Sequence, residues 1–180
     1  MIFCGSLPPG LPPEAFGEML RQCRAADAAV AADTSGEALA TAVKSRLWLV
    51  SPNRAELAGL TGVDPDDHAA LRAAATALTD RVEQVLLSLG EAGAMLVTAE
   101  GAWSAAATRA ADEVGSTVGL GDALLAGYVT GCVAGLSGPD ALREAVAVAS
   151  ATAVCPEPRE FRLADLERLR GQVTMSSDDQ

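Results

Sequence analysis

The chemically most suggestive part of the sequence is a glycine-rich stretch that leads into an apolar segment, Gly115–Gly127. Its residues, GSTVGLGDALLAG, predict a turn followed directly by a helix. The first N–H groups of a helix lack internal partners, and with the helix dipole they favour an anion such as a phosphate. Asp122 falls in the first turn, where an ionised carboxylate could accept a proton from an attacking hydroxyl. The alternative interpretation is a tightly packed helix start with Asp122 as an N-terminal charge.

Two common phosphate-binding motifs are excluded at this stretch. A Walker A loop requires lysine after the last glycine, and the residue after Gly121 is Asp122. The dinucleotide fingerprint G-x-G-x-x-G requires a third glycine at a fixed place, which Gly119-Leu120-Gly121 does not supply. A phosphate site here would therefore be of another kind.

Three further loops follow predicted strands and could bring polar groups to a ligand: Gly5–Gly10, Asn53–Glu56 and Ser88–Gly93. An amide and a carboxylate, as in Asn53 and Glu56, can hold a hydrated Mg²⁺, but the same pair also fits a helix capping box. Considered alone, the first loop also fits a rigid turn and the last a hairpin turn. We expect all four loops to converge on one crevice.

Short apolar runs alternate with helical patterns along the chain. Strands are expected at 2–4, 28–32, 47–50, 85–89, 94–98 and 102–108. Helices are expected at 13–24, 37–43, 54–60, 64–81, 122–133, 139–154 and 163–169. This alternation predicts an α/β fold with a mostly parallel sheet covered on both faces, and the turn at Gly93 suggests an antiparallel edge. We expect one domain over residues 1–173 and a polar tail over 174–180.

Composition excludes several classes of protein. With 180 residues, 49% hydrophobic and 21% charged, the chain is globular in composition. A net charge of −11 makes nucleic acid an unsuitable partner. No stretch offers the roughly 20 apolar residues of a membrane span, and the N-terminus lacks signal-peptide features, so a cytoplasmic location is the default expectation. Four scattered cysteines and the single His68 do not form a zinc-binding pattern.

In their order along the chain, these motifs resemble the C-terminal part of a sugar kinase of the ribokinase-like (phosphofructokinase B) family. The similarity is closest to the 1-phosphofructokinases and tagatose-6-phosphate kinases, and extends to about Pro156. It rests on the segments GSLPPG, DTSGEAL, SPNRAEL, SLGEAG and STVGLGD, which begin at residues 5, 33, 51, 88 and 116.

The resemblance implies a ribokinase-like three-layer α/β/α fold with the family's N-terminal half and β-sheet lid absent. It implies transfer of the ATP γ-phosphoryl group to a hydroxyl of a ketohexose phosphate, in particular fructose 1-phosphate to fructose 1,6-bisphosphate, with Mg²⁺. By this resemblance, Asp122 is the general base, and Asn53 and Glu56 organise Mg²⁺, mainly through water. The same resemblance assigns Gly119, Leu120 and Gly121 to an anion hole, Ser88, Gly90, Gly93 and Thr117 to the nucleotide, and Gly5 and Ser6 to the sugar phosphate.

Two residues depart from the family pattern. Leu120 stands where the family has a small residue, and Ser51 stands where it has a lysine. Besides an active kinase, the sequence leaves open a non-catalytic kinase remnant and an interaction protein that pairs through an exposed sheet edge. It also leaves open a homodimer.

Overall fold

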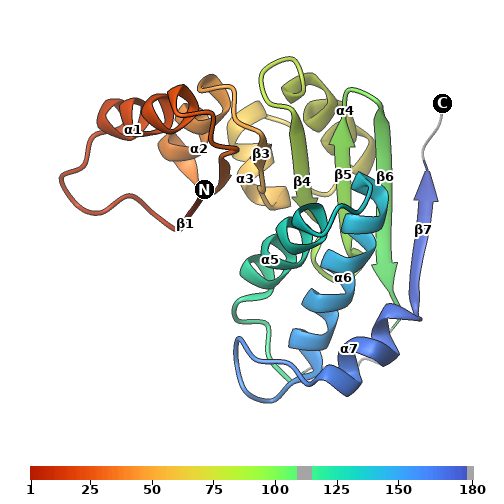
Figure 1. The fold of residues 1–180 in the computed structure, drawn as a ribbon. Coiled ribbons are helices and arrows are strands. Elements are labelled where there is room, and N and C mark those ends of the chain that lie inside the picture. Colours follow the sequence, from red (N-terminus) through yellow and green to blue (C-terminus); the bar gives the residue numbers. More distant parts are fainter. Residues whose placement is uncertain (109–114, 178–180) are drawn as a thin grey trace. The chain divides into compact units, whose positions relative to one another are not determined.

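The computed structural model describes residues 1–108 and 115–177 (Figure 1). Seven strands follow one another in the sheet in the order β1 to β7. The chain divides into two compact units, one comprising Met1–Leu87 and Val97–Ala102, the other Ser88–Leu96 and Trp103–Gln180. Each is described by itself below.

The first unit consists of successive strand–helix–strand connections. Its elements are β1 (Ile2–Cys4), α1 (Pro13–Ala25), β2 (Ala31–Asp33), α2 (Gly36–Lys44), β3 (Leu49–Val50), α3 (Arg54–Thr61), α4 (His68–Leu78) and β4 (Gln84–Ser88), whose last residue belongs to the second unit. The first four strands pair in parallel, with Cys4 opposite Asp33 and Val50 opposite Val85. The parallel pairing places the loops after these strands at one edge of the sheet.

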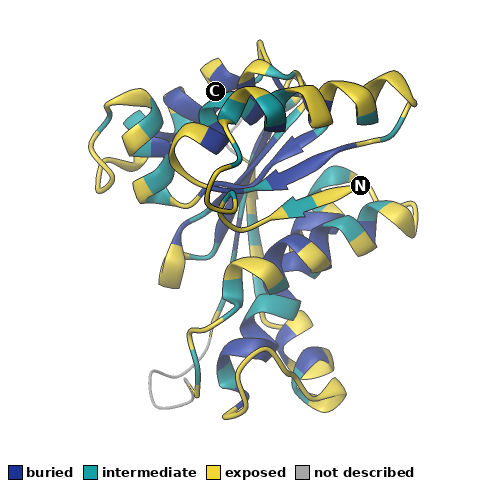
Figure 2. Cartoon of the chain, turned by 90° about the vertical axis from the view of Figure 1, so that its left-hand side faces the viewer, coloured by how far each residue is buried: buried dark blue, intermediate teal, exposed yellow. Residues whose placement is uncertain are grey.

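Burial explains why the strands of this unit are short and apolar. Ala31 and Ala32 in β2 and Leu49 and Val50 in β3 are all buried. Figure 2 shows that buried residues concentrate along strands and on one side of the helices. A parallel sheet covered in this way needs continuous apolar runs rather than alternation, which is what the sequence provides.

The second unit contains three helices and the end of the sheet. Its elements are the 3₁₀ turn η1 (Gly90–Ala92), parts of β5 (Ala94–Thr98) and β6 (Gly101–Ala107), then α5 (Leu120–Val133), α6 (Gly138–Val154), α7 (Leu163–Arg170) and β7 (Val173–Ser177). Helices α5 and α6 lie side by side (Figure 1). A Cβ at Gly127 would lie only 2.8 Å from the Ala145 Cα, so glycine permits the close approach of these helices.

The end of the chain differs from the prediction. We expected a polar tail from Thr174, whereas Val173–Ser177 form β7, which pairs antiparallel with β6. Only Val173 and Met175 alternate with exposed polar residues, neither is fully buried, and backbone pairing supplies the order that burial does not. Residues 178–180 of the predicted tail lie outside the described residues.

Two other boundaries also differ. The predicted helix at 64–81 begins only at His68, because Asp64 accepts a hydrogen bond from the Asp66 N–H in a turn and Asp67 caps the helix by accepting from the Ala70 N–H. The third strand covers Leu49–Val50 rather than 47–50. The remaining predicted helices and strands are confirmed to within a few residues.

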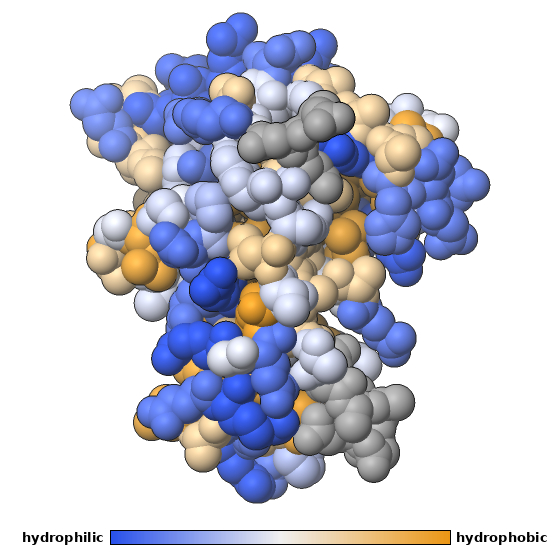
Figure 3. All heavy atoms as spheres, turned by 90° about the vertical axis from the view of Figure 1, so that its right-hand side faces the viewer, coloured by the Kyte–Doolittle hydropathy of each residue, from blue (hydrophilic) through white to orange (hydrophobic). Residues whose placement is uncertain are grey.

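On the face shown in Figure 3, hydrophilic residues predominate and hydrophobic ones form small separate groups. Among the described residues, no helix is both long enough and apolar enough to cross a membrane.

Candidate active site

The second unit contains a cavity of about 320 Å³ at the start of α5. Its walls come from the turn after β4, the end of β6, the first turns of α5 and the second half of α6. The lining residues are Ser88, Gly90, Glu91, Gly93, Ala107, Thr117, Leu120, Gly121, Leu124, Val146, Ala149 and Ser150. The cavity therefore combines small, mostly apolar walls with a helix N-terminus.

The start of α5 has the geometry of an anion site. Gly119 is the N-cap residue with φ +82°, a left-handed conformation that glycine adopts readily, and it has no side chain to cap the helix. The loop before it is shaped by the Ser116 hydroxyl, which accepts a hydrogen bond from the Val118 N–H at 3.2 Å. The first N–H groups of the helix thus lack a side-chain partner and remain available to an anion.

The loop that leads to this helix is held against the end of α6. The N–H groups of Gly115 and Ser116 both donate to the Ala153 carbonyl, at 2.8 and 3.2 Å. A Cβ at Gly115 would lie 2.7 Å from the Cys155 carbonyl oxygen, so only glycine fits without a shift. This backbone contact fixes where the anion site begins.

The turn between β4 and β5 forms another wall of the cavity. The Leu89 N–H donates to the Gly93 carbonyl at 2.8 Å and closes the turn. Gly93 has φ +89° and packs against the backbone of β6, where a Cβ would lie 2.0 Å from the Ala105 carbonyl oxygen. Without a side chain at this residue, the backbone of the turn lies directly on the strand.

Ser150 is the polar group that is most enclosed in this cavity. It is 3% exposed and lines the cavity. A hydroxyl in a mostly apolar wall can orient a ligand through one hydrogen bond. Ser150 therefore gives the cavity one polar group that a ligand could bond.

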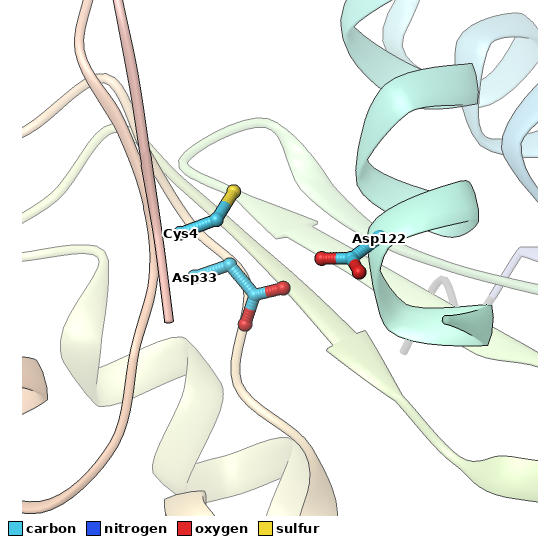
Figure 4. Close-up of side chains that lie close together, drawn as sticks. All are labelled: Cys4, Asp33 and Asp122. Atoms are coloured by element: carbon cyan, nitrogen blue, oxygen red, sulfur yellow. The ribbon is translucent and has the colours of Figure 1, made fainter. Parts of the chain in front are cut away.

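In the first unit, the loop after β1 is tied to the end of β2. The Gly5 N–H donates to the Asp33 carbonyl at 2.9 Å, and the Thr34 hydroxyl donates to the Gly5 carbonyl at 2.8 Å. Ser6 follows and is exposed. Figure 4 shows the side chains of Cys4 and Asp33 at the ends of their neighbouring strands, and that of Asp122 on the first turn of α5.

Asn53 and Glu56 form a capping box at the start of α3. The Asn53 N–H donates to Glu56 Oε2 at 2.8 Å, and the Glu56 N–H donates to Asn53 Oδ1 at 2.9 Å. Both residues also line an open depression of about 680 Å³ together with Glu37. The second carboxylate oxygen of Glu56 is not used by the cap, so a capping role and a role toward a hydrated cation are compatible.

The predicted site residues thus fall into two groups. Ser88, Gly90, Gly93, Thr117, Leu120 and Gly121 line one cavity in the second unit. Gly119 and Asp122 flank the last two of these on the chain, whereas Gly5, Ser6, Asn53 and Glu56 belong to the first unit. The convergence of all four loops stays a prediction.

Sequence reasoning missed half of the cavity. The missed lining residues are Glu91, Ala107, Leu124, Val146, Ala149 and Ser150. Val146, Ala149 and Ser150 have the i, i+3, i+4 spacing of one helix face, a signal that was present in the sequence. The same spacing is typical of core packing, so the pattern alone does not distinguish a ligand wall from a core face.

Comparison with known proteins agrees with this geometry. Residues 1–163 match the model of the pfkB family carbohydrate kinases. The 1-phosphofructokinase of Haemophilus influenzae is 37% identical over 148 residues, which are 82% of this chain and 47% of that protein. The chain spans about half the length of the relatives it matches.

Solved structures agree on the fold. Phosphofructokinase-2 from Escherichia coli, in complex with substrates and products, matches 94% of this chain and 55% of its own with a TM-score of 0.87 at 26% identity. Arabidopsis thaliana ribokinase complexed with ribose and ATP matches 88% of this chain and 53% of its own with a TM-score of 0.73 at 25% identity. These similarities confirm the predicted ribokinase-like α/β fold, and together with the family match they show that the chain belongs to the pfkB family of carbohydrate kinases.

Proposed function

We propose that this chain carries the nucleotide-binding part of a kinase that transfers the γ-phosphoryl group of ATP to a hydroxyl of a sugar phosphate. The observation that carries the proposal is the cavity of the second unit, which joins apolar walls and the enclosed Ser150 hydroxyl to the uncapped start of α5. The similarity to 1-phosphofructokinases supports fructose 1-phosphate as the substrate and fructose 1,6-bisphosphate as the product.

The cavity suits a nucleotide at both of its ends. Leu124, Val146 and Ala149 provide apolar surface for a base, and Ser150 provides one hydrogen bond that fixes its orientation. Gly119 and Gly121 have no side chains, which leaves space beside the N–H groups of Leu120 and Gly121. Phosphates need this space to approach the backbone. Ser88, Gly90, Gly93 and Thr117 then lie along the ribose and phosphates.

Asp122 is proposed as the general base. In the reaction, a sugar hydroxyl oxygen attacks the γ-phosphorus, the bond from that phosphorus to the β,γ-bridging oxygen breaks, and ADP leaves. The hydroxyl proton passes to the Asp122 carboxylate. The N–H groups of Gly119, Leu120 and Gly121 stabilise the negative charge on the transferred group.

Mg²⁺ and the sugar phosphate are assigned to the first unit. Glu56, with the carboxylate oxygen that the capping box leaves unused, and Asn53 would hold a hydrated Mg²⁺. The ion supplies neutralisation of phosphate charge when bound. The exposed Ser6 and the backbone at Gly5 are proposed to contact the phosphate of the sugar.

Binding and turnover are tested separately. Calorimetric titration with adenosine and with Mg·ADP should show binding of both, with the diphosphate tighter. Formation of fructose 1,6-bisphosphate from Mg·ATP and fructose 1-phosphate, compared with tagatose 6-phosphate, tests the reaction and the substrate. Absence of nucleotide binding in a folded chain would refute the proposal, whereas binding without product would favour a non-catalytic remnant.

A further inference from the structure

The positively charged side chain of Arg159 lies beside Gly119, at the start of α5. Arg159 belongs to the connection between α6 and α7. Its side-chain stem covers Gly119, because a Cβ on that glycine would lie 2.7 Å from Arg159 Cγ and 3.6 Å from Cδ. The guanidinium directly follows Cδ in the side chain, so its charge lies within reach of a phosphate at the start of α5.

The backbone at Arg159 is held in an unusual conformation. Its φ is +66°, a left-handed value that it shares, among non-glycine residues described, only with Asp27 and Arg46. Such a conformation costs a residue with a Cβ free energy and persists where surrounding structure over-determines it. In this conformation the long basic side chain of Arg159 lies against Gly119, the N-cap residue of α5.

Two acidic residues of the second unit, Glu157 and Glu144, have partners other than Arg159. The Glu157 carboxylate accepts a hydrogen bond from the Cys155 thiol at 3.3 Å, which with the nearby charge of Arg162 lowers the pKa of Glu157. Arg170 forms a paired contact with Glu144 at 2.7 and 2.8 Å. Within the part of the chain that the structure describes, Arg159 has no ion pair, and its charge is available to a ligand.

We infer that Arg159 binds the nucleotide phosphates at the start of α5, adding a charge-assisted contact to the backbone N–H groups of the anion site. This inference rests on the proposed function. An observation independent of the helix end is the cavity of about 320 Å³ itself, which Leu120 and Gly121 line together with the buried Ser150. A planar guanidinium is well suited to phosphate because it can donate two parallel hydrogen bonds.

The test compares a ligand with phosphates to one without. Adenosine and Mg·ADP are titrated into the wild-type chain, Arg159→Met and Arg143→Met. Methionine keeps an apolar stem on Gly119 while removing the charge, and Arg143, an exposed residue of α6 outside the cavity lining, is the matched control for loss of one positive charge. We expect Arg159→Met to weaken Mg·ADP about 10- to 100-fold, as loss of a charge-assisted hydrogen bond does, and to leave adenosine unchanged.

A second variant at the same residue keeps the test valid if Arg159→Met fails to fold. Arg159→Gly suits the left-handed backbone, so it should fold, and it should lose Mg·ADP affinity to the same degree. Equal Mg·ADP affinity in the wild type and both Arg159 variants overturns the inference alone. An equal loss in Arg143→Met, or an equal loss for adenosine, also overturns it. A wild-type chain that binds neither ligand overturns the proposed function and the inference with it.

Discussion

Replacing Gly93 by alanine places a methyl group inside the backbone of β6. The added Cβ would lie 2.0 Å from the Ala105 carbonyl oxygen and 2.8 Å from the Ala106 Cα. Backbone atoms of a strand cannot rotate aside as a side-chain tip can, so the turn or the strand must move. The turn is also a wall of the cavity proposed to bind the nucleotide, and the movement should therefore affect both stability and binding.

Gly90 in the same turn provides the matched control. Its φ is +66°, but a Cβ there would meet nothing within 4 Å. Gly90→Ala therefore costs only the left-handed conformation, about 1 kcal/mol. Gly93→Ala adds overpacking against backbone to a conformational cost of the same kind, for a total of about 3 kcal/mol or more.

Thermal unfolding of the two variants measures the difference. For a chain of this size, 1 kcal/mol corresponds to roughly 2–4 °C in Tm. Gly90→Ala should thus lower Tm by about 2–4 °C, and Gly93→Ala by about 6–12 °C or more with a clear loss of adenosine affinity. Equal Tm values for the two variants would refute the reasoning, because the close approach to β6 would then have no energetic weight.

Four further outcomes are expected. Asp122→Asn should lower kcat by roughly 10²–10⁴ with little change in Mg·ADP affinity, and a near-wild-type rate would remove Asp122 from the role of base. Leu120→Ala should tighten Mg·ADP binding in calorimetry if the leucine crowds the phosphates, and unchanged affinity would show that only its backbone matters. Asn53→Ala should lower the free energy of unfolding by about 1 kcal/mol in denaturant titration, because it removes the side-chain acceptor at the start of α3. Burial raises the pKa of the Cys155 thiol, so as pH rises through the usual thiol range iodoacetamide should modify the exposed Cys4 well before Cys155, which mass spectrometry of peptides can follow.

The sequence predicted those parts of the fold whose residue types leave few alternatives. Pro139 and the glycine-rich turn that ends at Gly121 both marked the starts of predicted helices, and the short apolar runs of β2 and β4, each followed by turn residues, were predicted as strands. β7 was missed because its alternation is short, with only Val173 and Met175 apolar, and because backbone hydrogen bonds rather than burial order the strand.

Site residues could be predicted from the sequence where the backbone conformation or a close contact requires glycine. Gly93 and Gly119 have positive φ, and close contact or an uncapped helix start requires glycine at each. Ser150 and Arg159 escaped notice because their roles come from packing between distant segments: a serine on an apolar helix and an arginine in a polar loop look ordinary in sequence. Only the three-dimensional contact with Gly119 makes Arg159 a candidate.

The residues proposed to bind the nucleotide and those proposed to bind the sugar phosphate and Mg²⁺ belong to different units, which has a consequence for how function is tested. All the described groups proposed to bind the base and the phosphates, from Ser88 to Arg159, belong to the second unit, whereas Ser6 and Glu56 belong to the first. Nucleotide binding therefore depends on the internal packing of one unit, and phosphoryl transfer additionally requires a sugar hydroxyl within reach of Asp122. Variants of the first-unit residues should then change turnover while leaving adenosine binding intact. A variant such as Gly93→Ala should impair both, because the cavity itself is altered.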